Sequence, residues 1–368
     1  MIYLVALLVL YTLLLAIMAY RPLFSKHSVS CETKHLQPVS IIICARNEER
    51  SIVACIESIL QQDYPHDLME VIVVNDASDD RTGAIAKELL VKSGITAKVI
   101  TNPTRKGKKA SLVFAIQHAT CKLIVTRDAD TAAPSPMWLQ LMVSPLIEQP
   151  LTLVAGPVTL KPNSGLLWAL QAIEQNILTM VGGGSIQLKL PFLCSGANMA
   201  FSKKLFDLTG QFKSHLHLES GDDVFFLNDV KKTKSARITF LNNPAALVYT
   251  SAMANFKTLL NQKARWASKN KYNRNLTNLS VALLTATINA AWLVVLIYGW
   301  LYPEKNNWLM VFLAGKIVSD ILLLIPSLVF TRNWSLLLPA FTVGFIYPVY
   351  ACVVGVYALL RRPSWRSA

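Results

Sequence analysis

The sequence predicts an α/β domain with a mostly parallel sheet, joined to one N-terminal and about three C-terminal transmembrane helices. Only 16% of its 368 residues are charged, whereas about 25% is usual for soluble domains. The shortage comes from four apolar stretches, and the rest of the chain alternates β-branched runs with segments of helical periodicity. This pattern excludes a disordered chain, a fibrous protein, a disulfide scaffold and a purely soluble enzyme.

Each of the four apolar stretches is long enough for a helix to cross a bilayer, which takes about 20 residues. They are residues 1–20, 276–302, 308–330 and 335–360. The first lacks a preceding basic residue and is longer than the core of a signal peptide, so we expect a retained anchor. The basic residues that follow it place the downstream side in the cytoplasm: Arg21, Lys26 and Lys34.

A basic segment without any acidic residue runs from Val230 to Pro303 and contains ten lysines and arginines. Each such charge near an anionic bilayer is attracted by about 1 kcal/mol. A solvated face of the domain is an alternative interpretation. A nucleic-acid surface is another, but no zinc spacing or recognised nucleic-acid motif accompanies the charge. We therefore expect membrane lipids, and no nucleic acid, among the partners.

The side on which the C-terminus lies stays open. Three spans after a cytoplasmic domain would place it outside, whereas the basic tail, residues 361–368, favours the inside. Pro339, Gly344 and Pro348 would allow the last stretch to return as a re-entrant segment, provided that its backbone is buried in protein.

Two further features lie in or near the apolar stretches. Lys316 and Asp320 are four residues apart on one predicted helix, so they face the same way and can pair. A structural ion pair and a role beside a lipid or acceptor path are both open. We also predict an interfacial helix near 165–181 that is followed by a flexible break at Gly182–Gly184.

The region between the first and second stretches reads as alternating strands and helices. The apolar β-branched runs lie at 39–45, 71–74, 98–101 and 123–125. Helical periodicity and caps predict helices near 52–60, 81–92 and 107–119. This order implies parallel strands joined by right-handed crossovers.

Polar residues follow three of these strands. They are Arg46, Asn47 and Glu48, then Asp76, then Asp128 and Asp130. Ligands of such sheets bind beyond the carboxyl ends of the strands, and an Asp-x-Asp pair can hold a hard divalent cation. The chain contains neither a P-loop nor a Gly-x-Gly-x-x-Gly motif, which excludes a P-loop NTPase and disfavours a dinucleotide enzyme.

An ordered series of motifs resembles the family-two glycosyltransferases. The series is Val39–Glu49, Val73–Asp80, Lys106–Ala110, Asp128–Asp130, Ser195–Phe201, Ser220–Asp223 and Gln262–Trp266. The match covers about 40–270, and with the flanking helices it is most similar to the membrane branch that contains cellulose synthase, hyaluronan synthase and ceramide glucosyltransferase. The resemblance implies a GT-A-type sheet flanked by helices.

The resemblance also implies roles for individual residues. Those for the nucleotide-sugar are Ala45, Arg46, Glu48, Asp76, Lys108, Asp128, Gln262 and Arg265. The implied ligands of Mg²⁺ or Mn²⁺ are Asp130 and Asp128, and the implied acceptor-binding residue is Trp266. The implied catalytic residues are Asp223, as the base, and Asp222. Ala45-Arg46 replaces the frequent Thr-Tyr of the first motif, which weakens the case for side-chain contacts to the base there.

Elementary chemistry agrees with these roles. A metal ion neutralises the departing diphosphate, and a carboxylate accepts the proton of the attacking hydroxyl. The planar fork of Arg265 suits two phosphate oxygens, and Trp266 offers a flat face to a sugar or lipid head. A single displacement by the acceptor inverts the anomeric centre.

The leading hypothesis is an inverting, metal-dependent membrane glycosyltransferase that uses a nucleotide-sugar, with a UDP-sugar as the expected donor. The acceptor is a lipid or a short glycan; a processive polysaccharide synthase is the alternative. A non-catalytic nucleotide-sugar-binding scaffold is the rival of another class, and a transporter has no need of strand-end carboxylates.

The expected organisation has five segments. They are an anchor (1–22), a linker (23–37), a cytoplasmic GT-A-type domain with interfacial helices (38–275), a transmembrane region (276–360) and a basic tail (361–368). The protein is expected to be integral to a membrane, the plasma or inner membrane in a bacterium.

Overall fold

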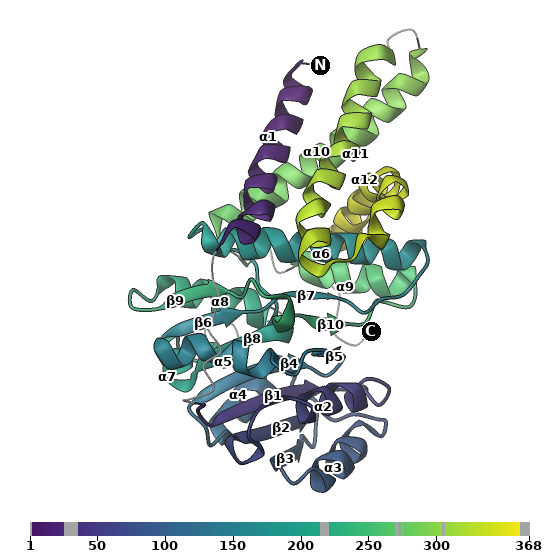
Figure 1. Ribbon diagram of the computed structural model, residues 1–368. Coiled ribbons are helices and arrows are strands. Elements are labelled where there is room, and N and C mark those ends of the chain that lie inside the picture. The colour runs from purple at the N-terminus through teal and green to yellow at the C-terminus, as the bar shows by residue number, and fades with distance from the viewer. Residues whose placement is uncertain are drawn as a thin grey trace. The chain divides into compact units, whose positions relative to one another are not determined.

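The computed structural model describes residues 2–25, 36–213, 221–268, 272–273, 275–303 and 306–360 (Figure 1). It divides the chain into two compact units. The first contains Met1–Phe24, Pro162–Phe192 and Ala252–Ala368, and the second contains Ser25–Lys161 and Leu193–Ser251. Several residues of the sequence argument lie outside the described ranges: Lys26, Lys34, Ser220, Lys269, Lys271, Arg274 and the basic tail 361–368.

The second unit is built on a seven-stranded sheet with the strand order β3-β2-β1-β4-β8-β6-β9. Strand β1 (Val39–Ala45) pairs in parallel with β2 (Met69–Asn75) and with β4 (Leu123–Asp128), and β2 pairs in parallel with β3 (Thr96–Thr101). These four strands are the ones that the sequence predicts. The prediction of a mostly parallel sheet flanked by helices is confirmed (Figure 1).

The remaining strands show how the chain completes the sheet. Strand β8 (Met199–Ser202) runs antiparallel between β4 and β6 (Thr152–Ala155), and β9 (Arg237–Phe240) is parallel to β6. A second, three-stranded sheet has the order β5-β10-β7. Its strands are β5 (Thr131–Ala132), β7 (Val158–Leu160) and β10 (Val248–Thr250). Neither β8 nor this small sheet is predicted from the sequence.

Helices cover both faces of the large sheet. They are α2 (Ile52–Leu60), α3 (Thr82–Lys92), α4 (Lys108–His118), α5 (Trp138–Glu148), α7 (Lys203–Leu208) and α8 (Asp222–Lys232). In β1, Ile41 and Ile43 belong to the core on the side of α2, α3 and α5, whereas Ile42 belongs to the core that α4, α7 and α8 cover. Successive side chains of a strand point to opposite faces, so a strand buried on both faces reads as a continuous apolar run.

The first unit collects the apolar helices. Among the described residues, four of its helices are long and apolar enough to cross a membrane, at Ile2–Phe24, Leu276–Leu301, Leu309–Thr331 and Trp334–Leu360. The helices of this unit are α1 (Ile2–Tyr20), α6 (Leu166–Gln187), α9 (Phe256–Ser268), α10 (Leu276–Leu301), α11 (Asn306–Thr331) and α12 (Leu337–Leu360). One N-terminal and three C-terminal candidate spans are present, as predicted, and α12 continues as one helix through Pro348.

The predicted flexible break at Gly182–Gly184 is wrong, because α6 continues as a helix to Gln187. The glycines serve close packing instead. A Cβ atom on Gly184 would lie 1.7 Å from the backbone oxygen of Met18 on α1. Small residues allow helix backbones to approach each other closely, as they do in membrane helix pairs.

The predicted ion pair between Lys316 and Asp320 is present on α11. The Lys316 Nζ atom lies 2.6 Å from Asp320 Oδ2, and the side chain of Lys316 is 0% exposed. Charges buried among apolar helices persist when they are paired in this way.

Candidate active site

The loops after β1 and β2 are tied together at the carboxyl ends of these strands. Asn47, with φ of 56°, accepts a hydrogen bond at Oδ1 from the backbone N–H of Asp79, and its own N–H donates to Ser78 Oγ. This holds Arg46 beside the strand end, with Nη2 3.8 Å from Asp79 Oδ2. The Arg46 Nη1 atom is buried and has no hydrogen-bond partner in the structure. Ala45 is buried at the last position of β1.

Asp76, directly after β2, organises the approach to α4. Its carboxylate accepts hydrogen bonds at 2.8 Å from Asn102 Nδ2 and from the backbone N–H groups of Lys106 and Gly107. Gly107 has φ of 89° at the start of α4, a conformation that favours glycine. Asp76 therefore fixes the loop that delivers Lys108, and its side chain is buried with both oxygens occupied.

Lys108 lies between two carboxylates that come from different strands and helices. Its Nζ atom is 2.5 Å from Asp128 Oδ1, at the end of β4, and 3.3 Å from Asp222 Oδ2, at the start of α8. Burial opposes the charge, but the two carboxylates outweigh it and hold the pKa of Lys108 well above its usual value. A Cβ on Gly196 would lie 3.0 Å from Asp222 Oδ2, so a larger residue there would push against this carboxylate.

Asp130 and Glu48 complete an acidic group beside Asp128. The pKa of Asp130 is raised by burial and by the Asp128 carboxylate, although Thr250 Oγ1 donates a hydrogen bond to it at 2.9 Å. Burial and the nearby Asp130 raise the pKa of Glu48 to about 7. The lysine thus neutralises one part of the cluster, whereas Asp130 and Glu48 repel each other.

The donor set fits a hard divalent cation that shares its coordination with a substrate. Within the described ranges, no three Asp, Glu, His or Cys side chains gather closely enough to hold a metal ion by themselves. Asp128 and Asp130 offer carboxylate oxygens, and Mg²⁺ is commonly held by one or two carboxylates together with phosphate oxygens of the substrate.

Asp222 and Asp223 open α8, and they differ in surroundings. Gly221, with φ of 89°, precedes them. Asp222 is buried against Lys108, whereas Asp223 is half-buried and accepts a hydrogen bond at Oδ1 from the backbone N–H of Val224. Negative charge is favourable in the first turn of a helix. The structure therefore assembles Ala45, Arg46, Glu48, Asp76, Lys108, Asp128, Asp130, Asp222 and Asp223 in the second unit.

Arg127 is a residue beside this cluster that the sequence argument misses. Its side chain is buried, its guanidinium lies over the ring of Trp138 at 4.4 Å, and Nε donates to Thr131 Oγ1 at 3.1 Å. The Nη1 and Nη2 atoms have no hydrogen-bond partner in the structure. Burial lowers the pKa of Arg127, and Asp128 and Asp130 counteract this. The sequence did offer a signal for Arg127, because an arginine that closely follows an apolar predicted strand is unusual.

Gln262, Arg265 and Trp266 lie on α9, which belongs to the first unit. There Lys263, one residue after Gln262, has its Nζ atom 2.6 Å from Glu174 Oε2 on α6. The same ammonium lies over the Trp266 ring, 4.2 Å from the centroid. Helix α9 is thus held to α6 through a buried ion pair, and Trp266 is held by the lysine of that pair.

Comparison with known families and proteins adds independent findings. A family model described as glycosyl transferase family 2 matches residues 40–209. Probable glycosyltransferase YdaM of Bacillus subtilis (strain 168) is 28% identical over 248 residues, which are 65% of this chain and 56% of that protein. Poly-beta-1,6-N-acetyl-D-glucosamine synthase of Staphylococcus epidermidis is 27% identical over 149 residues, 40% of this chain and 34% of that protein. The matches thus span between about a third and somewhat over half of these relatives.

A solved structure is similar over nearly the whole chain. It is the mannosyltransferase PcManGT from Pyrobaculum calidifontis in complex with GDP-Man and Mn²⁺, with a TM-score of 0.57 and 19% identity. The similarity covers 95% of this chain and 97% of that one, and at this identity it shows a shared fold. The fold, the ordered motifs and the family model agree, and residues 40–209 form a glycosyl transferase family 2 domain.

Proposed function

We propose that this chain is an inverting, metal-dependent membrane glycosyltransferase that transfers a sugar from a nucleotide-diphosphate sugar to a lipid or a short glycan. The observation that carries the proposal is the cluster of Asp128, Asp130 and Asp222 around Lys108, with Glu48 beside Asp130, at the carboxyl ends of parallel strands in a family 2 domain. Ligands of open α/β sheets bind at this end of the strands.

The donor is held by the loops after β1, β2 and β4. The buried Nη1 of Arg46 has no hydrogen-bond partner among the residues that the structure describes, and an oxygen of a bound nucleotide would satisfy it. Lys108 supplies a fixed positive charge for the diphosphate. Asp128 and Asp130 would hold Mg²⁺ or Mn²⁺, which supplies charge neutralisation of the leaving diphosphate. The donor is proposed to be a UDP-sugar.

Asp223 is proposed as the general base. Asp222 is engaged by Lys108 at 3.3 Å, so it positions the lysine. The half-buried Asp223, which matches the last acid of the motif, is proposed to accept the proton of the acceptor hydroxyl. Bonding of that oxygen to the anomeric carbon and departure of the nucleoside diphosphate in one displacement would give a β-linked product from an α-linked donor.

The acceptor end is proposed to involve Gln262, Arg265 and Trp266 of α9. The catalytic domain is proposed to lie on the cytoplasmic side of a bilayer, where nucleotide-sugars occur and where the basic segment 230–303 meets anionic lipid heads. The poly-N-acetylglucosamine synthase among the relatives favours a second candidate, processive synthesis of a polysaccharide.

The deciding experiment uses purified full-length protein with a panel of nucleotide-sugars, Mg²⁺ or Mn²⁺, and a membrane lipid extract, with products sized by mass spectrometry. One or two sugars on lipid are expected, and a long ladder would favour the synthase. Asp223→Asn is expected to lose transfer by at least about 100-fold while it still binds the nucleotide. The exposed Asp67→Asn serves as the matched control. Nucleotide binding without any turnover in the unmutated protein would instead support the scaffold.

A further inference from the structure

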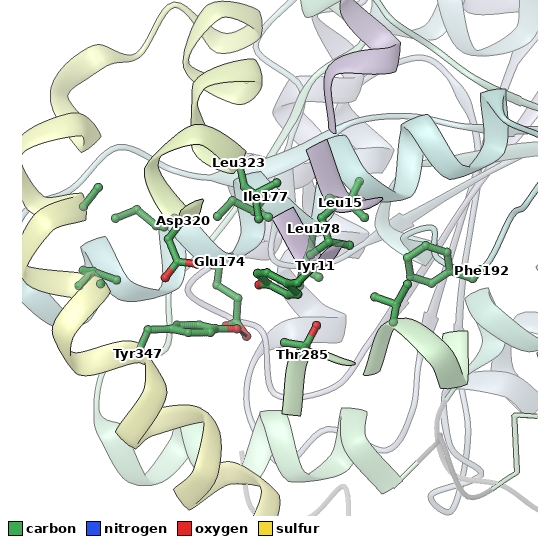
Figure 2. A pocket seen from close by; sticks show the side chains of 16 residues that line it. Tyr11, Leu15, Glu174, Ile177, Leu178, Phe192, Thr285, Asp320, Leu323 and Tyr347 are labelled. Carbon is green, nitrogen blue, oxygen red and sulfur yellow. Dashed lines mark hydrogen bonds between the residues drawn. The ribbon is translucent and has the colours of Figure 1, made fainter. Parts of the chain in front are cut away.

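A cavity of about 90 Å³ lies among the helices of the first unit, with walls from α1, α6, α10, α11 and α12 (Figure 2). Most of its lining is aliphatic, including Leu15, Ile177, Leu178 and Val343. Apolar cavities of about 150 Å³ stay dry and bind molecules of the size of benzene. At about 90 Å³ the present cavity is smaller than these, and its aliphatic lining accepts a segment of a hydrocarbon chain.

One side of the cavity is polar and carries acceptor and hydroxyl oxygens. Figure 2 shows Glu174, Asp320 and Tyr347 on this side, with the Tyr347 hydroxyl 3.5 Å from Glu174 Oε1. Tyr11 and Thr285 also line the cavity. No lysine or arginine is among the described residues that line it.

Both carboxylates are paired with lysines that lie behind the lining. Lys316 contacts Asp320 at 2.6 and 2.7 Å and lies over the rings of Tyr11 and Tyr347, at 5.9 and 5.7 Å from their centroids. Lys263 contacts Glu174 at 2.6 Å and is 8% exposed. An anionic head in the cavity would face carboxylate and hydroxyl oxygens, whereas an uncharged hydroxyl can donate a hydrogen bond to them.

We propose that this cavity binds the acceptor lipid of the enzyme, a lipid with an uncharged, hydroxyl-bearing head such as a diacylglycerol. The inference rests on the proposed function, of which it specifies the substrate class. A diacylglycerol offers one hydroxyl donor for Glu174 and chains for the aliphatic wall, and the remainder of the lipid lies in the bilayer. The same hydroxyl is the nucleophile of transfer, so the cavity holds the acceptor before the reaction and the hydroxyl leaves Glu174 when it reacts.

The polar side of the cavity is also connected to α9. Glu174 lines the cavity and holds Lys263, and Lys263 lies over the Trp266 ring. Tyr357 on α12 adds a second link, because its hydroxyl donates to Asn261 Oδ1 at 2.6 Å. A lipid head at Glu174 therefore acts on the lysine that positions Trp266, and Lys263 is a positioning residue for the acceptor end.

The first test measures binding and does not depend on transfer. The full-length protein in nanodiscs is irradiated with a diacylglycerol that carries a diazirine on one acyl chain, and labelled peptides are mapped by mass spectrometry. Labels are expected on α6 and α12. Ala340→Leu, which fills the lining, is expected to reduce labelling at least fivefold, and Ala290→Leu on the exposed side of α10 to leave it within twofold. Equal labelling of both variants overturns the proposal.

Competition distinguishes the acceptor lipid from bulk membrane lipid. Unlabelled diacylglycerol is expected to displace the probe, whereas phosphatidic acid and phosphatidylcholine with the same chains are not. Displacement by all three overturns the assignment of the head. If Ala340→Leu does not purify as a folded protein, Val343→Leu adds one methylene to the same lining and replaces it. Labelling without turnover of any nucleotide-sugar would remove the proposed function alone, and turnover without labelling would remove the cavity proposal alone.

The second test addresses Lys263. Lys263→Met is expected to raise the KM for diacylglycerol at least fivefold, with the KM for the nucleotide-sugar within twofold of its original value. A parallel rise in both constants would assign Lys263 a merely structural role and overturn the link to the cavity.

Discussion

The two ends of the parallel strands in the second unit use carboxylates in opposite ways. At the amino ends, Glu70 of β2 accepts hydrogen bonds from Ser40 Oγ, from Lys98 Nζ and from the backbone N–H of Thr120. Its side chain is 2% exposed, and the partners belong to β1, to β3 and to the loop that precedes β4. At the carboxyl ends, Asp130 has one hydroxyl donor and faces Asp128.

The difference appears in the direction of the pKa shifts. Burial raises the pKa of Glu70, but the donors Lys98, Ser40 and Thr120 outweigh it and hold the value below the ordinary one. Burial raises the pKa of Asp130, and Asp128 raises it further. A carboxylate with a lowered pKa stabilises the fold at neutral pH, and one with a raised pKa destabilises it. We infer that the carboxylate at the amino ends of the strands stabilises the sheet, whereas the carboxylates at the carboxyl ends repel each other until a cationic ligand binds.

Asp130→Asn gives the largest expected effect and separates the two ends most sharply. Activity is expected to fall at least about 100-fold, since the amide cannot serve as an anionic metal ligand. The melting temperature of the metal-free protein is expected to stay the same or rise, because a repelled charge is removed. Turnover and thermal unfolding in detergent measure the two effects. A large drop in melting temperature would contradict the division between the two ends.

Lys108→Met tests the cation that contacts both Asp128 and Asp222. It removes the Lys108 contacts of Asp128 and Asp222, and losing hydrogen bonds to charged groups costs about 2 kcal/mol. In a domain of this size that lowers the melting temperature by about 4–8 °C. Asp222→Asn in the same background is expected to restore part of the loss, which a double-mutant cycle measures. Additive effects of the two substitutions would show that the contact carries no coupling.

The sequence predicted the elements that depend on a local pattern of residues. It did not predict the elements whose place depends on where a distant segment returns to the sheet. The runs at 39–45 and 123–125 are continuously apolar because both faces of the sheet are covered, so their strands could be predicted. The same holds for the carboxylates that follow them. Strand β8 could not be predicted, since its antiparallel direction follows from where the chain re-enters the sheet after the helices of the first unit.

Single side chains show the same limit. Asp76 stands in the predicted motif, but nothing local reveals that its oxygens are occupied by Asn102 and the 106–107 backbone. Gly184 reads as a break because glycine disfavours helices, whereas its contact with Met18 of α1 comes from a segment 166 residues away. Contacts between distant segments carry no signature in either local sequence.

Glu70→Gln tests the amino end and is expected to act on stability alone. The amide cannot accept all three hydrogen bonds as well as the carboxylate does, at a cost of about 1.5 kcal/mol. We expect a melting temperature lower by about 3–6 °C. The specific activity of the folded fraction should match that of the unmutated protein, measured at a temperature well below both transitions. A loss of activity comparable to that of Asp130→Asn would erase the contrast between the two ends.

The smallest expected effect is the pH dependence of the difference in melting temperature between each variant and the unmutated protein. The pKa of Glu70 is lower in the folded than in the unfolded chain, so its contribution is present above the unfolded value of about 4.5. It is lost as the pH falls through the folded value, because the unfolded chain then binds a proton more readily. The gap in melting temperature between Glu70→Gln and the unmutated protein should therefore be constant between about pH 6 and 8 and narrow below about pH 4.5. For Asp130→Asn the difference has the opposite sign: the variant should melt at or above the temperature of the unmutated protein, and its excess should increase as the pH rises through the raised pKa of Asp130. Thermal scans of the metal-free protein across this range measure both differences, each taken as variant minus unmutated protein, and two differences of the same sign would show that the two ends of the strands hold their carboxylates alike.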